Sequence, residues 1–398
     1  MNSEYKVILD LGNSDTRVYV RFFSKKKNRV VSKRIELSNR FYSMPLGTVV
    51  PTSYKPEHTS VIQIDGEYVG FYANGELVLR EYEKISTRPT SNTSKSSFNS
   101  ALSFALAVVK AVRIIAEENG VQPQDVRGNC HVVALLPPIY CNKTEIEKLE
   151  AEFRKIKTVT DMYTSEGTQL TIPVNISSVV VFPEGFAAYI GCMYDKELEI
   201  RKGYEKYETE PVLIMDVGAG TTDIMVVAGT EIIDSTKETI RTGGNNVKSK
   251  LSRMIRTKYN YGSILDSQLE KAMITGLIAD GTQDIDVSDL VMMAKTEVAN
   301  GLVNSVNDFL EGTDYPLRAI RGLLPAGGGT LGGNNDNITS LASVIVNLIK
   351  DFSPNIDIIE LPDKLDDNNK VILEDGKPVK MSPRELNIEG ALILSEAE

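Results

Sequence analysis

The chain has 398 residues, a length that predicts two or more domains. Its composition, with 41% hydrophobic and 25% charged residues, is that of an ordinary protein able to bury sizeable cores. The net charge of -10 argues against broad direct binding to nucleic acid, and the two histidines and three scattered cysteines argue against a His-based triad, a zinc site or a disulfide framework.

The first 80 residues are predicted to be mainly β-structure. The opening MNSEYKVILD lacks the layout of a signal peptide and contains a strand at 5–10, followed by a turn and a strand at 16–23. Residues 61–72 are predicted to form a hairpin with Asp65-Gly66 at its turn. Residues 86–97 form a polar loop. The scattered cysteines and the opening without a signal-peptide layout favour a reducing cytosol.

A long apolar helix is predicted from residue 98, with Gly120 at its end. No apolar run in the chain is predicted to span a membrane. A buried strand at 131–138 and an amphipathic helix at 143–156 follow. A further strand stops at Pro183 and leads into a short buried helix.

The second half alternates in the same way after a polar linker at 195–210. The predicted elements are a hairpin at 212–229, helices near 245–260, 288–311 and 338–352, strands at 318–329 and 355–361, a turn at Asp375-Gly376 and a closing helix at 385–398. Alternation of strands and helices through both halves predicts an α/β fold with sheets covered by helices.

Two hairpins about half a chain apart share one pattern. KVILDLGNSDTRVYVRFF and VLIMDVGAGTTDIMVVAG are each a strand, Asp-x-Gly, three variable residues, Thr and a second strand. Glycines allow the backbone to approach a ligand, successive N–H groups suit phosphate oxygens, and an aspartate at a strand end can hold Mg²⁺. The repeat therefore predicts two similar halves that clamp a di- or triphosphate.

A third glycine-rich segment, LLPAGGGTLGGN, follows a strand. Its GGGTLG formally satisfies the Rossmann fingerprint, and Glu360 ends the next strand. That interpretation leaves Asp10 and Asp216 unexplained. The alternative is a glycine-rich wall for an adenine and ribose. No Walker A sequence occurs.

Taken in order, the DLGNSDTR turn, the strand-Pro-Glu-Gly segment, DVGAGTTD and AGGGT resemble the actin/Hsp70/sugar-kinase superfamily over nearly the whole chain. Within it, length and layout are most similar to bacterial actin-like proteins of the plasmid-segregation (ParM-type) group. The resemblance implies two similar actin-like (ribonuclease H-like) domains with a nucleotide cleft between them. Domain I would comprise residues 1–184 with the closing helix 385–398, and domain II residues 185–384.

The resemblance also implies residue roles. Glu184 would orient the attacking water, Asp216 would hold Mg²⁺ through water, and Asp10 would lie near the metal. Contacts with the nucleotide would come from Gly12, Asn13, Ser14, Gly218, Ala219, Gly220, Thr221, Thr222, Gly243, Gly244, Asn245, Gly327, Gly328, Gly329 and Thr330. Arg17 stands near the position where many relatives carry a phosphate-binding lysine. Lys295 and Glu297 either contact adenine or ribose or lie on a solvated helix face.

The implied function is a cytoplasmic ATPase that binds ATP or GTP with Mg²⁺ and assembles head-to-tail into filaments. DNA would be segregated through a DNA-binding adaptor protein, without direct nucleic-acid or membrane contact. A sugar-type kinase and a non-filamentous scaffold remain alternatives. A chaperone would need a further peptide-binding domain, and a membrane tether a basic tail, whereas this chain closes on LSEAE. The basic run at 24–34 is a solvated hairpin tip or a filament contact with the acidic segment 363–367.

Overall fold

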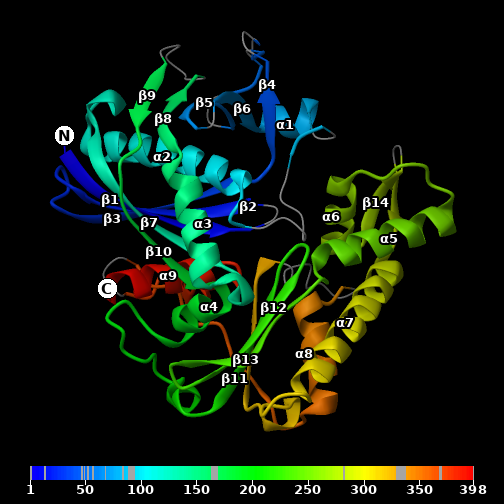
Figure 1. The fold of residues 1–398 in the computed structure, drawn as a ribbon. Coiled ribbons are helices and arrows are strands. Elements are labelled where there is room, and N and C mark those ends of the chain that lie inside the picture. Colours follow the sequence, from blue (N-terminus) through cyan, green and yellow to red (C-terminus); the bar gives the residue numbers. More distant parts are fainter. Residues whose placement is uncertain are drawn as a thin grey trace.

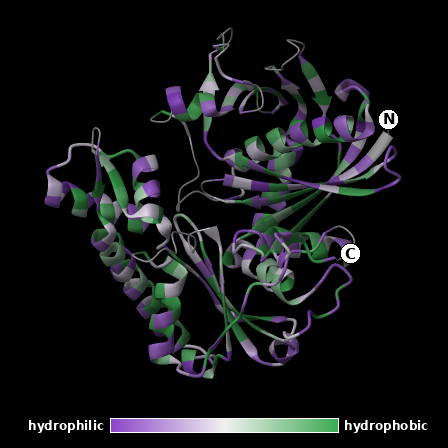
Figure 2. Ribbon diagram, turned by 180° about the vertical axis from the view of Figure 1, so that it is seen from behind, coloured by the Kyte–Doolittle hydropathy of each residue, from purple (hydrophilic) through white to green (hydrophobic). Residues whose placement is uncertain are grey.

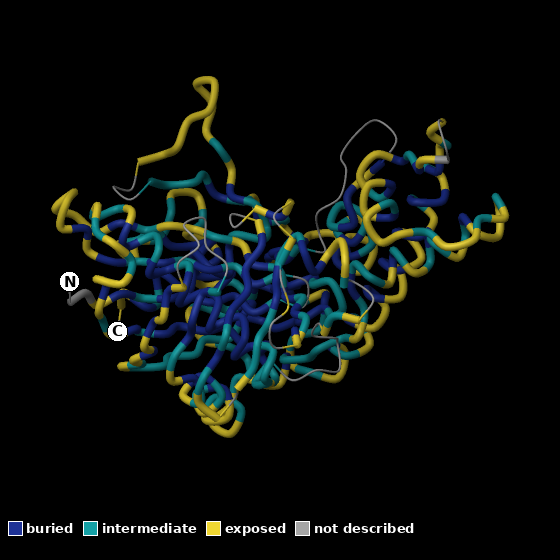
Figure 3. The backbone as a smooth tube through the Cα atoms, turned by 90° about the horizontal axis from the view of Figure 1, so that it is seen from above, coloured by how far each residue is buried: buried dark blue, intermediate teal, exposed yellow. Residues whose placement is uncertain are grey.

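The computed structural model places three five-stranded sheets and their covering helices among the residues it describes (Figure 1). These are residues 2–12, 15–45, 48, 50–51, 53–55, 58–67, 69–82, 85–87, 95–162, 169–280, 283–328, 338–366 and 370–397. Hydrophobic residues concentrate in the strands and in the helices packed on them (Figure 2). Seen from above, the centre of the molecule is buried, and exposed segments lie at its rim (Figure 3).

The first two sheets share one topology. The first has the order β10-β7-β1-β2-β3 and the second β13-β12-β11-β16-β17. In each, a three-stranded antiparallel unit continues into parallel strands. Their strands are β1 (Asn2–Leu11), β2 (Asp15–Ser24), β3 (Arg29–Ser38), β7 (Arg127–Leu136), β10 (Ile176–Pro183), β11 (Pro211–Val217), β12 (Thr222–Ala228), β13 (Glu231–Ile240), β16 (Gly322–Ala326) and β17 (Asp357–Ile358). The repeat predicted from the two Asp-x-Gly turns is therefore confirmed.

The third sheet is antiparallel, in the order β4-β6-β5-β8-β9. Its strands are β4 (Phe41–Met44), β5 (Thr59–Gly66), β6 (Gly70–Gly75), β8 (Ile156–Asp161) and β9 (Leu170–Pro173). The predicted β5–β6 hairpin forms, but placing its turn at Asp65-Gly66 was wrong. These two residues pair with β8, so β5 continues through them and the chain reverses after Gly66.

Two small hairpins account for the remaining strands of the described residues. One joins β14 (Leu277–Asp280) and β15 (Gln283–Asp286), and the other joins β18 (Leu373–Glu374) and β19 (Lys377–Pro378). The second reverses at Asp375 and Gly376, with φ of 51° and 76°. Positive φ at both central residues is the requirement of a type I′ turn, so the predicted turn at this dipeptide is confirmed.

The helices are α1 (Glu76–Glu81), α2 (Phe98–Asn119), α3 (Lys143–Arg154), α4 (Glu184–Met193), α5 (Gly244–Tyr259), α6 (Asp266–Thr275), α7 (Ser288–Leu310), α8 (Leu341–Phe352) and α9 (Leu386–Ala397). Gly120 caps α2 in the left-handed conformation, as predicted. The sequence prediction omitted α6. This helix buries only Leu269 and Ala272, so its apolar periodicity is weak.

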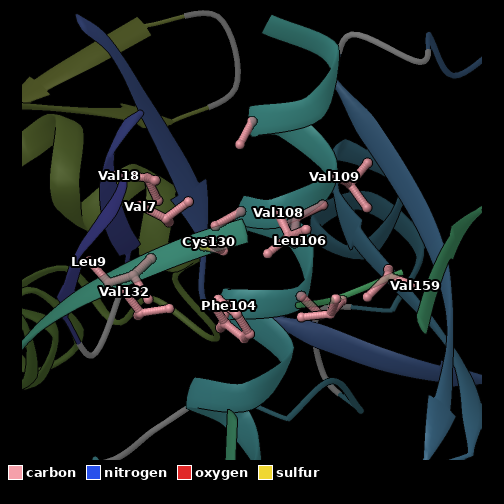
Figure 4. Packing of buried hydrophobic residues seen from close by; sticks show 14 of the residues in the cluster. Val7, Leu9, Val18, Phe104, Leu106, Val108, Val109, Cys130, Val132 and Val159 are labelled. Atoms are coloured by element: carbon pink, nitrogen blue, oxygen red, sulfur yellow. The ribbon is translucent and has the colours of Figure 1, made fainter. Parts of the chain in front are cut away.

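Helix α2 is the core helix of the first half. It packs between the first and third sheets, with Phe104 and Val108 facing a core that includes Val7 of β1 and Val159 of β8 (Figure 4). By length and composition it could cross a membrane, contrary to the expectation that no run is long enough, but 72% of its most apolar window is buried inside the protein. Burial between two sheets explains why the helix is apolar on nearly every side.

The basic run at 24–34 covers the tip of the β2–β3 hairpin, which agrees with the prediction of a solvated hairpin tip. Lys27 and Lys33 pair with Glu118 at the end of α2, at 2.5 and 3.0 Å. In the acidic segment 363–367, Asp363 pairs with Lys380 at 3.0 Å. Both segments thus have partners within the molecule, and a filament contact between them stays a prediction.

Helices α4 and α9 lie between the first two sheets. Residues of α4 pack with β11 and β12, and residues of α9 pack with β1 and β7. The two helix backbones touch at glycines. A Cβ atom added to Gly390 would lie 1.7 Å from the Ala187 carbonyl oxygen, and one added to Gly191 would lie 2.4 Å from the Leu386 oxygen. This close crossing holds the two helices together, and residues at the start of each, Glu184 and Asn387, line one cleft.

Candidate functional site

A cleft of about 280 Å³ opens where the β1–β2 and β11–β12 hairpins turn. Twelve of the residues predicted as a site line it together: Asp10, Gly12, Arg17, Glu184, Asp216, Gly218, Ala219, Thr221, Gly244, Asn245, Gly327 and Gly328. They come from strand ends and helix starts in both halves of the chain. The paired turns therefore meet in space, although about 200 residues separate them in the sequence.

The turn after β11 is supported from behind by the start of α5. Gly244 and Asn245 donate their backbone N–H groups to the carbonyl oxygens of Gly218 and Ala219, at 3.0 and 2.7 Å. A Cβ atom on Gly243 would lie 2.6 Å from the Gly218 oxygen. Gly243 therefore supports this turn by close packing and does not itself line the cleft.

Other predicted residues also lie away from the cleft wall. Thr222 is fully buried, and its hydroxyl donates to the Thr242 carbonyl oxygen at 2.7 Å. Gly220 belongs to the same turn but is not among the lining residues. Asn13, Ser14, Gly329 and Thr330 lie outside the described residues.

Lys295 is fully buried in α7. Its Nζ donates to the carbonyl oxygens of Met273 and Thr339, at 3.2 and 2.8 Å, and burial lowers its pKa to about 8. It ties the end of α6 to the segment before α8 and does not line the cleft. Glu297 pairs with Lys250 at 2.5 Å on the exposed side of α7, which agrees with the solvated-face reading.

Four carboxyl groups gather at the inner end of the cleft: Asp10, Glu184, Asp216 and Asp223, each at most 6% exposed. Arg17 offsets part of this charge, because its Nη1 donates to Asp10 Oδ2 at 2.8 Å. Burial raises the pKa of Asp216, and the neighbouring Asp10 raises it further. The pKa of Asp223 is likewise raised by burial, although the Lys95 charge and a hydrogen bond from Thr239 oppose the shift. Such crowding of buried carboxylates is a mark of functional sites.

Glu184 is the first residue of α4, and the Lys95 ammonium donates a hydrogen bond to it. Burial raises the pKa of Glu184, and Lys95 partly opposes this. Burial alone would lower the pKa of Lys95, but Glu184, Asp10 and Asp223 outweigh it, so that pKa is raised. Sequence reasoning missed Lys95. The available signal was a cation two residues before the N-cap Ser97 of α2, near a helix start where the dipole disfavours positive charge.

Asp216 is enclosed on two sides. Asn387 of α9 donates its Nδ2–H to Asp216 Oδ2 at 2.5 Å. On the other side, a Cβ atom on Gly327 would lie 2.2 Å from Asp216 Oδ1, and Gly327 has φ of +84°. Only glycine fits both this conformation and this approach. Sequence reasoning anticipated a closing helix but not the Asn387 contact.

The carboxylates do not form a metal cage by themselves. Among the described residues, no group of three or more His, Cys, Asp or Glu side chains is arranged to hold a metal ion. Mg²⁺ in nucleotide sites keeps several waters and takes one or two carboxylates together with substrate phosphates. Asp10 and Asp216, at equivalent strand ends, fit that mode of binding.

The outer wall of the cleft is formed by α5, α6 and the segment before α9. It is lined by Lys248, Glu270, Met273, Ile274 and Arg384, and Lys248 pairs with Glu270 at 2.9 Å. Apolar surface beside polar groups suits a nucleoside. Because α6 was not predicted, sequence reasoning missed this wall.

Two matching sheets, bridged by a helix pair and meeting at a cleft with paired Asp-x-Gly turns, define the actin-like fold. The antiparallel β11–β12–β13 unit excludes the Rossmann reading of the glycine-rich segment, which needs an open parallel sheet. The fold resemblance inferred from the sequence is therefore confirmed.

Comparison with known proteins agrees with the actin-like fold. Residues 214–332 match the family model of the C-terminal part of the archaeal actin homologue MreB-like proteins. The actin-like protein Alp7A is similar in structure, with a TM-score of 0.68, 16% identity, and coverage of 100% of this chain and 97% of that one. The chain of a 15-stranded ParM filament from Clostridium botulinum is also similar, with a TM-score of 0.64, 18% identity and coverage of 100% of both chains. The archaeal actin homologue Ta0583, in complex with ADP, is similar with a TM-score of 0.64 and 16% identity, and the match covers 99% of this chain and 100% of that one. None of the curated protein sequences matches the chain.

Proposed function

We propose that this protein is an actin-like ATPase that binds ATP or GTP with Mg²⁺ in the cleft and assembles head-to-tail into filaments. The observation that carries the proposal is the meeting of two equivalent Asp-x-Gly turns around a cluster of buried carboxylates. The fold likeness to a protein whose structure contains ADP and to a ParM filament supports nucleotide binding and self-assembly. We assign domain I to residues 1–184 with 385–398, and domain II to 185–384.

The two turns would hold the phosphates. Gly12, Gly218 and Thr221 line the cleft, and the Thr221 hydroxyl would donate to phosphate. The N–H groups of Gly12 and Gly218 donate to the carbonyl oxygens of Asp10 and Thr221, at 3.1 and 2.8 Å, so these glycines would act by letting the backbone approach the phosphates. A bound Mg²⁺ would neutralise phosphate charge, held by Asp10 and Asp216. Nearby Arg17 lines the same wall but already donates to Asp10, so its contact with phosphate remains a hypothesis.

Glu184 would act on the attacking water. As long as Lys95 donates to it, one carboxylate oxygen is engaged. Phosphate oxygens entering the cleft compete for the Lys95 ammonium, which frees Glu184 to accept a hydrogen bond from water and aim it in line. The raised pKa of Glu184 improves its match to proton chemistry near neutral pH.

Filament growth would follow from head-to-tail contacts that do not close into a ring. In that case nucleotide hydrolysis weakens the polymer, and DNA is moved through a separate DNA-binding adaptor in the cytoplasm. The adaptor, the segregation role and the location all rest on the likeness to ParM-type proteins and are part of the proposal.

Sedimentation and light scattering with MgATP, with MgADP and with EDTA test this function. The expected result is assembly at micromolar protein with MgATP, accompanied by phosphate release. Asp216→Ala should abolish both, whereas Asp234→Ala, which changes an aspartate that is exposed on β13, should change neither. If nothing assembles and a sugar raises ADP production, the protein is a kinase of the same fold instead.

A further inference from the structure

Asn387 comes from the far end of the chain and reaches the centre of the cleft. It lies in the first turn of α9, is only 4% exposed, and lines the cavity beside Asp216. The close crossing of α9 with α4 at Gly191 and Gly390 fixes its position. Asn387 and Glu184 are therefore carried by one rigid helix pair, although they lie about 200 residues apart.

The orientation of the Asn387 amide follows from its neighbour. A carboxylate oxygen only accepts hydrogen bonds, so the Nδ2–H group must face Asp216 Oδ2. The amide oxygen Oδ1 then points elsewhere, and it is buried without a hydrogen-bond partner among the described residues. Buried polar atoms are nearly always paired, so an unpaired acceptor in a cleft indicates a missing donor.

The surroundings restrict what that donor is. Asp216, which accepts from the amide, and Asp10 beside it cannot donate when ionised. The cation Arg384 lines the same cleft, but its Nε is buried without a hydrogen-bond partner among the described residues, so it does not supply the donor. A cation held by these aspartates would carry water molecules, and each of those waters is a strong donor. A metal-bound water beside Asp216 would donate one O–H to Asn387 Oδ1 and its other O–H to one of the aspartates.

We propose that Asn387 is a positioning residue for the divalent cation. Its Nδ2–H group holds the Asp216 carboxylate in one orientation, and its Oδ1 accepts a hydrogen bond from a water of the cation. This inference rests on the proposed nucleotide function. Groups that orient metal ligands from the outer shell typically contribute 10–100-fold in metal affinity, which sets the expected size of the effect.

The experiment measures Mn²⁺ binding to the protein–ADP complex by electron paramagnetic resonance. Asn387→Ala removes both amide groups and should weaken Mn²⁺ binding at least about tenfold, while ADP affinity in EDTA is unchanged. Asn387→Asp keeps acceptor oxygens and adds negative charge but loses the donor to Asp216, so its Mn²⁺ affinity should be retained or increased. Ser395→Ala is the matched control and should have no effect, because it changes a buried hydroxyl on the same helix that donates to the Leu392 carbonyl oxygen and does not line the cleft.

Each other outcome overturns the inference. Unchanged Mn²⁺ affinity in Asn387→Ala would remove any role toward the cation. Equal weakening in Asn387→Ala and Asn387→Asp would leave only the structural bond to Asp216. If circular dichroism shows that the alanine variant is unfolded, Asn387→Leu, which keeps the side-chain volume, replaces it in the comparison. Failure of the wild type to bind ADP would overturn the proposed function as well, so the two failures are distinguishable.

Discussion

Replacing Gly390 by alanine should force α4 and α9 apart. The new Cβ atom would lie 1.7 Å from the Ala187 carbonyl oxygen and 2.8 Å from the Gly191 nitrogen, and both obstacles are backbone atoms. Ordinary contact begins at 3.4 Å, so the helices must separate by roughly 1.7 Å. Overpacking usually costs about 1–3 kcal/mol, and because backbone cannot rotate away we expect about 3 kcal/mol or more.

Gly301 in α7 provides the matched control. It also lies inside a helix and is exposed, but among the described residues a Cβ atom added there would meet nothing within 4 Å beyond its chain neighbours and its own helix backbone. Gly301→Ala should therefore stabilise the protein by about 0.5–1 kcal/mol, because alanine loses less backbone entropy in a helix. Urea unfolding followed by circular dichroism measures both variants. A Gly390→Ala midpoint at or above that of the wild type would refute the close-crossing argument.

Three further predictions concern buried charges. Glu184→Gln should lower phosphate release about 10²–10⁴-fold while MgATP-dependent sedimentation is retained; an unchanged rate would assign the water to another group. Lys95→Met removes the charge that lowers the Glu184 pKa, so the rise of phosphate release with pH should move to higher pH; a pH profile that does not move contradicts this. Lys295 has a pKa lowered to about 8, so the folded state binds fewer protons than the unfolded state above that pH, and stability rises with pH. Relative to Lys295→Met, the wild type should gain about 2 kcal/mol in urea unfolding between pH 7.5 and 9.5, and a constant difference would refute the shift.

Local sequence determined the elements of the fold. The two Asp-x-Gly turns, the alternation of strands and helices and the Gly120 cap depend on backbone preferences that neighbouring residues set, so they could be read directly. Part of the site could be predicted with them, because each turn carries its aspartate and its glycines within a few residues. Helix α6 was not predicted, because its two buried residues give too weak an apolar periodicity.

Tertiary structure alone decided which side chains meet. Lys95 reaches Glu184 across 89 residues, and Asn387 reaches Asp216 across 171. Neither contact has a local signature, because each depends on where packing places a helix start. Lys295 shows the converse: its helix position suggested a nucleotide contact, but burial of the side chain turned its ammonium toward two backbone carbonyl oxygens instead. The sequence by itself determined the strands and turns of the two halves. The packing of α9 against α4 decided how the site is completed, because their close crossing at glycines holds the start of α9, with Asn387, against Asp216.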